Sequence, residues 1–453
     1  MTATAPLPVG AAGLPAGFRF GAATAAYQIE GAVREDGRGE SIWDRFSQRP
    51  GAVAGGDTGD VACGHYHRWA ADLDLMVALG LESYRFSIAW PRVQPDGRGA
   101  LNARGVAWYR RLVEGCLERG IEPVATLYHW DLPQARQEAG GWAVRDTALR
   151  FADYAALMAD ELGDVVGGWI THNEPWVVAI LGHAAGRKAP GIRDWPTALG
   201  VAHHLLLSHG LAVDALRAGS DAPVGITLNL NPMRPATDAD GAATARMDAH
   251  QNRWFLDPVL RGSYPVDLLE HYERTFGALP TLNPEDMDTI ARPLDFLGVN
   301  YYFPTTVRTS LDAPLQAETV TARGHTTAMG WAVDASGLHE LLLRLRADYG
   351  DLEIWITENG AAFDDERLVD GVVEDPARVR YLAEHLEALR QAVADGVNVA
   401  RYHAWSLLDN FEWEHGYDKR FGIVRVDYDT QERIPKRSAL WYRDHIASVR
   451  RAG

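Results

Sequence analysis

The chain has 453 residues, of which 47% are hydrophobic, so it can bury a large core. Its formal net charge of −17 and its pI near 5.4 argue against nucleic acid or an anionic membrane surface as a partner. A neutral small molecule remains compatible with this charge. The two cysteines, Cys63 and Cys116, are too few for a disulfide framework and fit a reducing compartment, so we expect a cytoplasmic protein.

The N-terminal segment and the apolar runs bear on targeting. Residues 1–10 contain no basic segment followed by an apolar core, so we expect no signal peptide. We find no apolar run near 18 residues, which predicts that no segment spans a membrane.

Eight apolar segments with the composition of strands recur along the chain, and amphipathic segments with helical spacing separate them. The predicted strands are residues 18–22, 83–90, 123–129, 169–174, 224–230, 296–302, 354–358 and 399–406. The predicted helices include residues 68–79, 106–119, 147–162, 198–218, 338–348 and 377–394. This alternation predicts a closed (β/α)8 TIM barrel. A doubly wound open sheet is the competing fold, but no glycine-rich phosphate turn follows the first strand.

The chain is longer than a minimal barrel, so some of the loops that follow strands must be extended. The clearest candidates are residues 36–66, 305–330 and 407–437. Residues 236–249 are small and polar but too short for a domain linker. We therefore predict an N-terminal tail over residues 1–16 and one catalytic domain over residues 17–453.

Two glutamates stand out because each follows a short apolar run. Glu174 ends the run that starts at Trp169, and Glu358 ends the run that starts at Ile354. A single glutamate in this position is usually a solvated strand end. Two carboxylates delivered to one site by different strands can instead hydrolyse a glycosidic bond, one protonating the leaving oxygen and the other attacking or activating water.

Other strand ends also carry polar or aromatic side chains, which are Arg85, His129, Trp130, Asn173, Asn229, Asn300, Tyr302, Asn359 and Trp405. The C-terminal ends of barrel strands meet on one face, and that face carries the chemistry in this fold. The sequence therefore predicts one site at that face.

Several further features have simpler interpretations. Two groups of histidines, His65 with His67 and His203, His204 with His209, lack a complete ligand set, so we predict no metal site. We interpret Asp72 and Asp74 as the outer face of a helix and residues 364–367 as a solvated loop.

Seven motifs give a family resemblance. They cover residues 20–31, 84–87, 128–133, 171–175, 295–302, 356–360 and 406–413. The most specific are Asn173-Glu174-Pro175 and Thr357-Glu358-Asn359-Gly360. The chain resembles a family 1 glycoside hydrolase of the β-glucosidase type from residue 18 to about residue 445.

This resemblance implies a retaining β-glucosidase that releases terminal non-reducing β-D-glucosyl residues through a glycosyl-enzyme intermediate. Glu174 would be the general acid/base and Glu358 the nucleophile, with their carboxyl groups about 5–5.5 Å apart. We expect the neighbouring negative charge to raise the pKa of Glu174. Arg85 and Tyr302 would keep Glu358 ionised.

The resemblance also implies a set of sugar-binding residues, which are Gln28, His129, Asn173, Asn300, Tyr302, Trp331, Trp405, Glu412, Trp413 and Phe421. Asn173 would contact the 2-hydroxyl, Trp405 would lie against the sugar ring, and Phe421 would close the pocket. The expected ligands are small β-glucosides and oligosaccharides, with no cofactor and no metal. The resemblance further suggests a role in cellulose and polysaccharide degradation.

Three alternative functions fit the sequence less well. A 6-phospho-β-glycosidase would need cationic groups for the phosphate, and Glu412 would repel it. A non-catalytic carbohydrate-binding relative would lack one of the two glutamates, and a thioglucosidase usually lacks the acid, here Glu174. The preference among gluco, galacto and fuco substrates stays open, as do the natural aglycone, product inhibition, transglycosylation and the oligomeric state.

Overall fold

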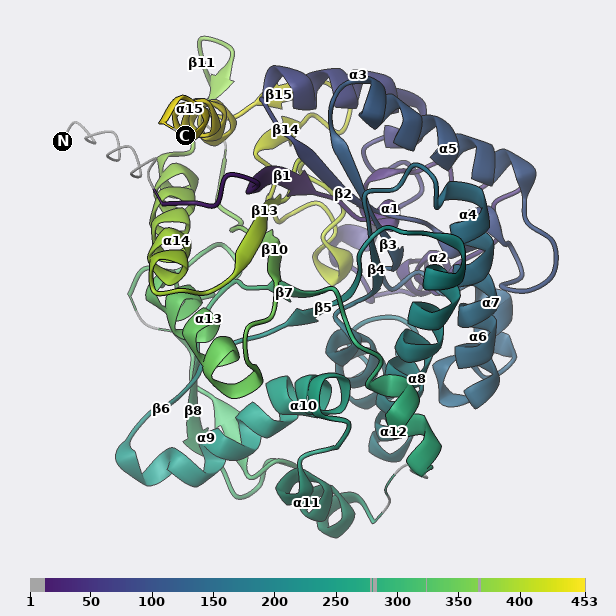
Figure 1. Cartoon of the computed structure of the whole chain (residues 1–453), viewed down its shortest axis with the longest axis vertical. Coiled ribbons are helices and arrows are strands. Elements are labelled where there is room, and N and C mark those ends of the chain that lie inside the picture. Colours follow the sequence, from purple (N-terminus) through teal and green to yellow (C-terminus); the bar gives the residue numbers. More distant parts are fainter. Residues whose placement is uncertain (1–12, 278, 280–282, 323, 366–367, 453) are drawn as a thin grey trace.

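Eight parallel strands of the computed structural model close into a barrel, which confirms the predicted (β/α)8 TIM fold (Figure 1). The structure describes residues 13–277, 279, 283–322, 324–365 and 368–452. The strand order is β1-β13-β10-β7-β5-β4-β3-β2, and β1 pairs in parallel with both β13 and β2. Because the first and last barrel strands pair, the open-sheet alternative is excluded.

All eight predicted strands are present, and their ends differ from the prediction by at most a few residues. The barrel strands are β1 (Arg19–Ala23), β2 (Ser83–Ser87), β3 (Glu122–Tyr128), β4 (Gly168–Asn173), β5 (Val224–Asn229), β7 (Phe296–Asn300), β10 (Ile354–Asn359) and β13 (Val399–Trp405). The largest difference is at β2, which ends at Ser87 because Pro91 favours the first turn of a helix and starts α4 (Trp90–Val93) there.

The predicted helices surround the barrel. They are α3 (His65–Ala78), α5 (Ala103–Glu118), α7 (Arg145–Leu162), α8 (Trp195–Gly219), α13 (Ser336–Tyr349) and α14 (Pro376–Ala394), and α15 (Arg437–Ala452) follows β13 and its long loop. The remaining helices are α1 (Ala26–Ile29), α2 (Ile42–Ser47), η1 (Ala54–Gly56), α6 (Gln134–Glu138), η2 (Gly141–Ala143), η3 (Val177–Ala184), η4 (Asp238–Asp240), α9 (Gly241–Asp248), η5 (Ala249–Arg253), α10 (Trp254–Arg261), α11 (Val266–Phe276), α12 (Pro284–Ile290) and η6 (Trp413–His415).

The three extended loops carry secondary structure of their own. Residues 36–66 contain α2 and η1. Residues 305–330 contain β8 (Thr305–Thr309), which pairs with β6 (Met233–Pro235) on one side and with β9 (Ala317–Thr319) on the other. Residues 407–437 contain η6 and the antiparallel pair β14 (Val424–Val426) and β15 (Arg433–Pro435). A short hairpin of β11 (Leu368–Val369) and β12 (Val372–Val373) follows β10.

An apolar cluster fills the barrel near the N-terminal ends of its strands. It consists of Val124, Ile170, Phe296 and Trp355, and the rings of Phe296 and Trp355 stack with their centroids 3.5 Å apart. Gly168 starts β4 beside this cluster, where a β-carbon would lie 2.8 Å from the Trp355 indole. The interior is therefore packed with apolar side chains at this end, and the opposite end is the one that carries the chemistry in this fold.

Helix α8 corrects the statement that the sequence contains no apolar run near 18 residues. Among the described residues it is the one helix whose length and composition would allow it to cross a membrane. However, 72% of its most apolar window is buried inside the protein, and it packs against α7, α12 and η3. Its apolar character is therefore explained by packing in the core.

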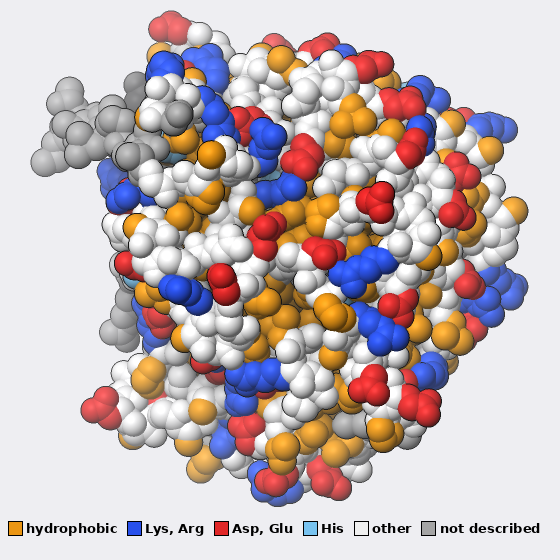
Figure 2. All heavy atoms as spheres, in the orientation of Figure 1, with side chains coloured by type: hydrophobic (Ala, Val, Ile, Leu, Met, Phe, Trp, Pro, Cys, Tyr) orange, Lys and Arg blue, Asp and Glu red, His pale blue; other side chains and the backbone are white. Residues whose placement is uncertain are grey.

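The exposed face in Figure 2 mixes the two signs of charge. Asp and Glu side chains alternate with Lys and Arg side chains around a central apolar area, and this face shows no basic patch.

Asp72 is buried, so the prediction that it lies on an outer helix face is wrong. Its carboxylate lies 2.8 Å from His65 Nδ1 and accepts hydrogen bonds from Arg433 at 2.8 and 3.0 Å. Asp74 does face solvent, where it pairs with Arg119. Helical spacing alone did not distinguish these two positions, because the partner of Asp72 comes from a distant loop.

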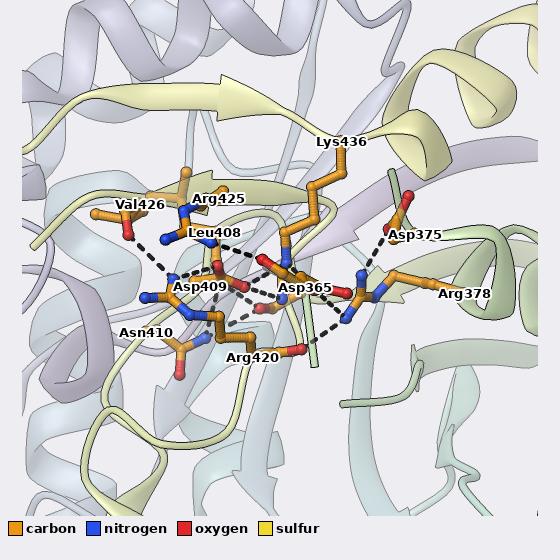
Figure 3. A network of polar contacts seen from close by, with 12 residues as sticks. Asp365, Asp375, Arg378, Leu408, Asp409, Asn410, Arg420, Arg425, Val426 and Lys436 are labelled. Carbon is orange, nitrogen blue, oxygen red and sulfur yellow. Dashed lines mark hydrogen bonds and ion pairs between the residues drawn. The ribbon is translucent and has the colours of Figure 1, made fainter. Parts of the chain in front are cut away.

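Asp365 is also buried, which contradicts its prediction as part of a solvated loop; Glu366 and Arg367 lie outside the described residues. Figure 3 shows that Asp365 belongs to a buried ionic network. Lys436 Nζ donates to Asp365 at 2.6 Å and to Asp409 at 2.7 Å, and Arg378 joins Asp365 to Asp375. The network ties both ends of the 407–437 loop to the segment after β10.

Replacing the central cation of this network should destabilise the protein. We expect Lys436→Met to lower the free energy of unfolding by about 3–5 kcal/mol, because it leaves buried carboxylates without their shared counter-charge. The loss is measured from urea denaturation curves. Arg437→Met is the matched control: Arg437 is the next residue, is half exposed and pairs with Glu374, so its loss should stay within about 1 kcal/mol. Equal losses in the two variants would contradict the structural role of the network.

Candidate active site

Glu174 and Glu358 reach the same end of the barrel from strands that are not neighbours. Glu174 directly follows β4, and Glu358 is the fifth residue of β10. Strands β5 and β7 lie between them in the barrel. Asn300, the last residue of β7, donates a hydrogen bond of 2.7 Å to Glu174 Oε1 and accepts one of 2.8 Å from Thr357, the residue before Glu358. One amide therefore connects the two positions.

The backbone is irregular where each glutamate emerges. The pairing of β10 with β7 shifts register between Ile356 and Glu358, and the pairing of β4 with β5 shifts between Ile170 and Asn173. Glu174 itself has a φ of +48°, a conformation that non-glycine residues rarely adopt. Such irregularities redirect side chains and are found near functional sites.

Glu358 is held by a cation and a phenol. Arg85, on β2, donates to Glu358 Oε1 at 2.6 Å, and Tyr302 Oη donates to Glu358 Oε2 at 2.6 Å. Both carboxylate oxygens are therefore bonded, and one partner is positively charged. Burial raises the pKa of Glu358, and Arg85 and Tyr302 oppose that rise.

Glu174 has weaker partners. Burial, and secondly the charge of Glu358, raise its pKa to about 8. From the sequence we expected the neighbouring charge to be the cause of this rise, but burial is the larger cause. The Asn300 amide is neutral, so it stabilises the carboxylate less than a guanidinium does. When Glu174 and Glu358 hold one proton between them, the proton is therefore favoured on Glu174, and Glu358 carries the negative charge.

Asn173 is oriented by three neighbours. Its Oδ1 accepts hydrogen bonds from Arg85 at 2.6 Å and Asn300 at 3.1 Å, and its Nδ2 lies 3.0 Å from His129 Nε2. Because Nδ2 is a donor, Nε2 of the neutral His129 ring accepts, and the ring proton lies on Nδ1. Burial keeps the pKa of His129 well below its usual value. Nδ1 is buried and has no partner among the described residues, so it is free to donate to a ligand.

Gln28 and Glu412 form the second polar edge of the site. Gln28 Nε2 donates to Asn410 Oδ1 and to the Phe411 carbonyl, both at 2.9 Å, and lies 3.4 Å from Glu412 Oε2. These bonds fix the amide and leave Gln28 Oε1 buried without a partner within the described chain. Burial raises the pKa of Glu412 to about 8.

Aromatic rings enclose these polar groups. The His129 ring stacks with Trp405 and with Trp413, and its centroid lies 5.9 Å from that of each indole. Trp405 and Phe421 share an apolar cluster against which Tyr302 and Trp331 pack. The Trp331 ring contacts the Tyr302 and Phe421 rings.

The structure thus brings the predicted site residues together at one end of the barrel. Arg85, Asn173 and Asn300 are hydrogen-bonded to one another or to the two carboxylates, and aromatic residues surround them. Sequence reasoning gave no role to Lys188, whose ammonium lies over the rings of Trp130 and Trp413. One signal for it was available: only three of the 44 Lys and Arg residues are lysines. The structure gives no metal-binding group of three or more His, Cys, Asp or Glu side chains in the part of the chain that it describes.

Comparison with known proteins agrees with this arrangement. The model of glycosyl hydrolase family 1 matches residues 11–450. The chain belongs to glycosyl hydrolase family 1. This family 1 chain is 48% identical over 438 residues to beta-glucosidase A of Acetivibrio thermocellus, which covers 95% of the chain and 98% of that relative. It is 47% identical over 456 residues to a bifunctional beta-D-glucosidase/beta-D-fucosidase of Bifidobacterium breve, covering 96% and 98%.

Solved structures of family 1 proteins are similar over the same length. The family 1 β-glucosidase of Thermotoga maritima superposes with a TM-score of 0.93 at 45% identity, covering 96% of this chain and 98% of that one. The Thermotoga protein is also known in complex with glucoimidazole and with deoxynojirimycin. The family 1 assignment therefore covers the barrel and its extended loops together.

Proposed function

We propose that this family 1 chain is a retaining β-glucosidase in which Glu174 is the general acid/base and Glu358 the nucleophile. The observation that carries the assignment is the difference between their partners. Glu358 is bonded to the Arg85 guanidinium and to the Tyr302 phenol, whereas Glu174 is bonded to the neutral Asn300 amide. Retention requires one ionised and one protonated carboxyl group, and this difference in partners supplies it.

The first half-reaction transfers the sugar to Glu358. A carboxylate oxygen of Glu358 attacks the anomeric carbon, the bond to the leaving oxygen breaks, and the proton of Glu174 passes to that oxygen. The products are the free alcohol and an ester between Glu358 and the sugar. Asn173, held by Arg85 and Asn300, is placed to bond the 2-hydroxyl as charge develops on the sugar ring.

The second half-reaction restores the enzyme. Once Glu358 is esterified, its negative charge is gone, so one of the causes that raise the pKa of Glu174 is removed. Glu174 then takes a proton from water, the hydroxyl oxygen attacks the anomeric carbon, and the ester bond to Glu358 breaks. Two inversions at one carbon leave the product in its original configuration.

The sugar pocket in this proposal is formed by the unpartnered polar atoms and the surrounding rings. His129 Nδ1 offers a donor, while Gln28 Oε1 and the Glu412 carboxylate offer acceptors. Trp405, Trp413 and Phe421 supply apolar faces for the C–H bonds of the ring, with Tyr302 and Trp331 beside them. Such a mixture suits a neutral, polyhydroxylated ligand.

Phosphorylated and plain substrates test the nature of the ligand. We expect wild-type enzyme to hydrolyse 4-nitrophenyl β-D-glucoside and to leave its 6-phosphate ester unreacted, because Glu412 places an acidic group among the sugar-binding residues. Release of nitrophenol is followed for both compounds. Turnover of the phosphate ester alone would overturn the neutral-sugar assignment. Galactoside and fucoside in the same panel rank the configurations, and the bifunctional Bifidobacterium relative motivates the fucoside.

Three further expectations belong to the proposal, concerning the domain, the biological role and the location of the protein. Residues 17–453 would act as one catalytic domain, which the single barrel built from strands between Arg19 and Trp405 supports. Release of glucose from cellobiose would support a role in cellulose degradation. A cytoplasmic location is supported by Cys63 and Cys116, both buried free thiols, and cell fractionation would test it.

A further inference from the structure

Lys188 lies in the segment between η3 and α8, beside the predicted sugar pocket. Its side chain is 11% exposed, and Nζ donates to Glu414 Oε2 at 2.6 Å. Glu414 is two residues after Glu412 and belongs to η6. An ion pair therefore joins the loops after β4 and β13. The loop after β4 begins with Glu174, the predicted acid, and the loop after β13 carries the predicted sugar-binding residues Glu412 and Trp413.

The same ammonium contacts two indoles. Nζ lies 5.1 Å from the Trp130 ring centroid and 5.8 Å from that of Trp413, within the range of cation–π attraction. The two indoles are in contact with each other, with centroids 4.5 Å apart. Both residues have positive φ, +75° at Trp130 and +49° at Trp413, so each backbone position needs support from surrounding contacts.

Apart from Lys188, the charged groups that act on Glu412 are negative. Glu414 lies on the same loop as Glu412. Glu358, the proposed nucleophile, and Tyr302 also act on Glu412 or are affected by it, and the Gln28 amide is its neutral neighbour. Lys188 is the cation that opposes this negative environment and the burial of Glu412. Its charge therefore favours the ionised carboxylate, which accepts hydrogen bonds from sugar hydroxyls.

We propose that Lys188 is a positioning residue for sugar recognition, which holds Glu412 and Trp413 in place through Glu414 and the two indoles and balances the charge of the two carboxylates. This inference rests on the proposed β-glucosidase function. It concerns binding of the glycone and leaves the chemistry to Glu174 and Glu358.

Neutralising Lys188 tests the inference. We expect Lys188→Met to raise KM for 4-nitrophenyl β-D-glucoside about tenfold, with kcat within about twofold of wild type. Without the cation the pKa of Glu412 rises, so Glu412 is protonated up to a higher pH. The acid limb of the kcat/KM profile should therefore move to higher pH by about one unit. A thermal melt shows that the variant is folded, and Lys188→Gln repeats the test if the methionine variant is not.

Two control variants separate position from charge. Arg187→Met removes the adjacent cation, which approaches the other oxygen of Glu414 at 3.4 Å but is 63% exposed, so KM and the pH profile should stay unchanged. Lys188→Arg keeps the charge and should restore most of the wild-type KM. If Lys188→Met and Arg187→Met behave alike, or if Lys188→Met lowers kcat with KM unchanged, the positioning role is wrong.

A binding measurement separates this inference from the proposed function. Glucose itself is titrated into wild type and Lys188→Met, and binding is followed by tryptophan fluorescence, since three indoles surround the site. We expect about tenfold weaker glucose binding in the variant. A wild type that binds glucose but hydrolyses no glucoside would refute the proposed function alone. Equal glucose affinity in an active wild type and in the variant would refute the role of Lys188 alone.

Discussion

Glu358→Gly should lower kcat for 4-nitrophenyl β-D-glucoside by about 10⁴-fold or more. The variant lacks the oxygen that attacks the anomeric carbon, and losing a nucleophile removes most of the rate enhancement of an enzyme that works through a covalent intermediate. The same change leaves Arg85 and Tyr302 without their shared acceptor. Steady-state rates are therefore compared at equal concentrations of folded protein, checked by thermal melts.

Azide distinguishes loss of the nucleophile from general damage. The space left by the side chain admits azide, which attacks the anomeric carbon and partly restores turnover, and we expect an α-glycosyl azide because one inversion takes place. A β-glycosyl azide would instead place Glu358 in the acid role. Glu340→Gln is a control: Glu340 is a half-exposed glutamate paired with Arg234, and its variant should keep wild-type kcat and show no response to azide.

Glu174→Gln should make the rate depend strongly on the leaving group. Without a proton donor, poor leaving groups such as the glucose of cellobiose should lose about 10²–10⁴-fold in kcat/KM, the contribution typical of general acid catalysis. A dinitrophenyl glucoside, whose leaving group needs no proton, should lose far less in its first step. The measurement is a series of aryl glucosides of increasing phenol pKa. An unchanged slope across the series would end the assignment of Glu174 as the acid.

The pH profile gives an independent check on Glu174. The acid must be protonated in the free enzyme, and burial together with Glu358 raises its pKa to about 8. Activity should therefore fall as the pH rises through about 8, because Glu174 loses its proton there. In Glu174→Gln this alkaline limb should disappear. An alkaline limb that persists in the variant would belong to another group.

The proton placement shows where sequence reasoning reached its limit. The sequence predicted a raised pKa at Glu174 and named the neighbouring charge as the cause, whereas burial is the larger one. It also expected Arg85 and Tyr302 to keep Glu358 ionised, and both do bond to it, although burial raises that pKa too. Burial depends on all the packed surroundings of a side chain, and no local motif encodes it.

Buried charges away from the site show the same limit. Asp72 was interpreted as part of an outer helix face and Asp365 as part of a solvated loop. Each is instead buried against a basic partner far along the chain, Arg433 for Asp72 and Lys436 for Asp365. Lys188 was overlooked for a related reason. Its partners Trp130 and Glu414 come from two other loops, and only the closed barrel brings them together.

The sequence by itself determined the fold and the identity of the two carboxylates. Eight apolar segments alternating with amphipathic ones are a periodic property of the chain, and in a barrel all C-terminal strand ends lie on one face, so the position of Glu174 and Glu358 on that face follows. The tertiary structure decided how each side chain is aimed and charged. The register shifts before both glutamates, the Asn300 bridge and the surroundings of Lys188 arise from contacts between segments far apart in the chain, and electrostatic energies depend on those distances and on burial.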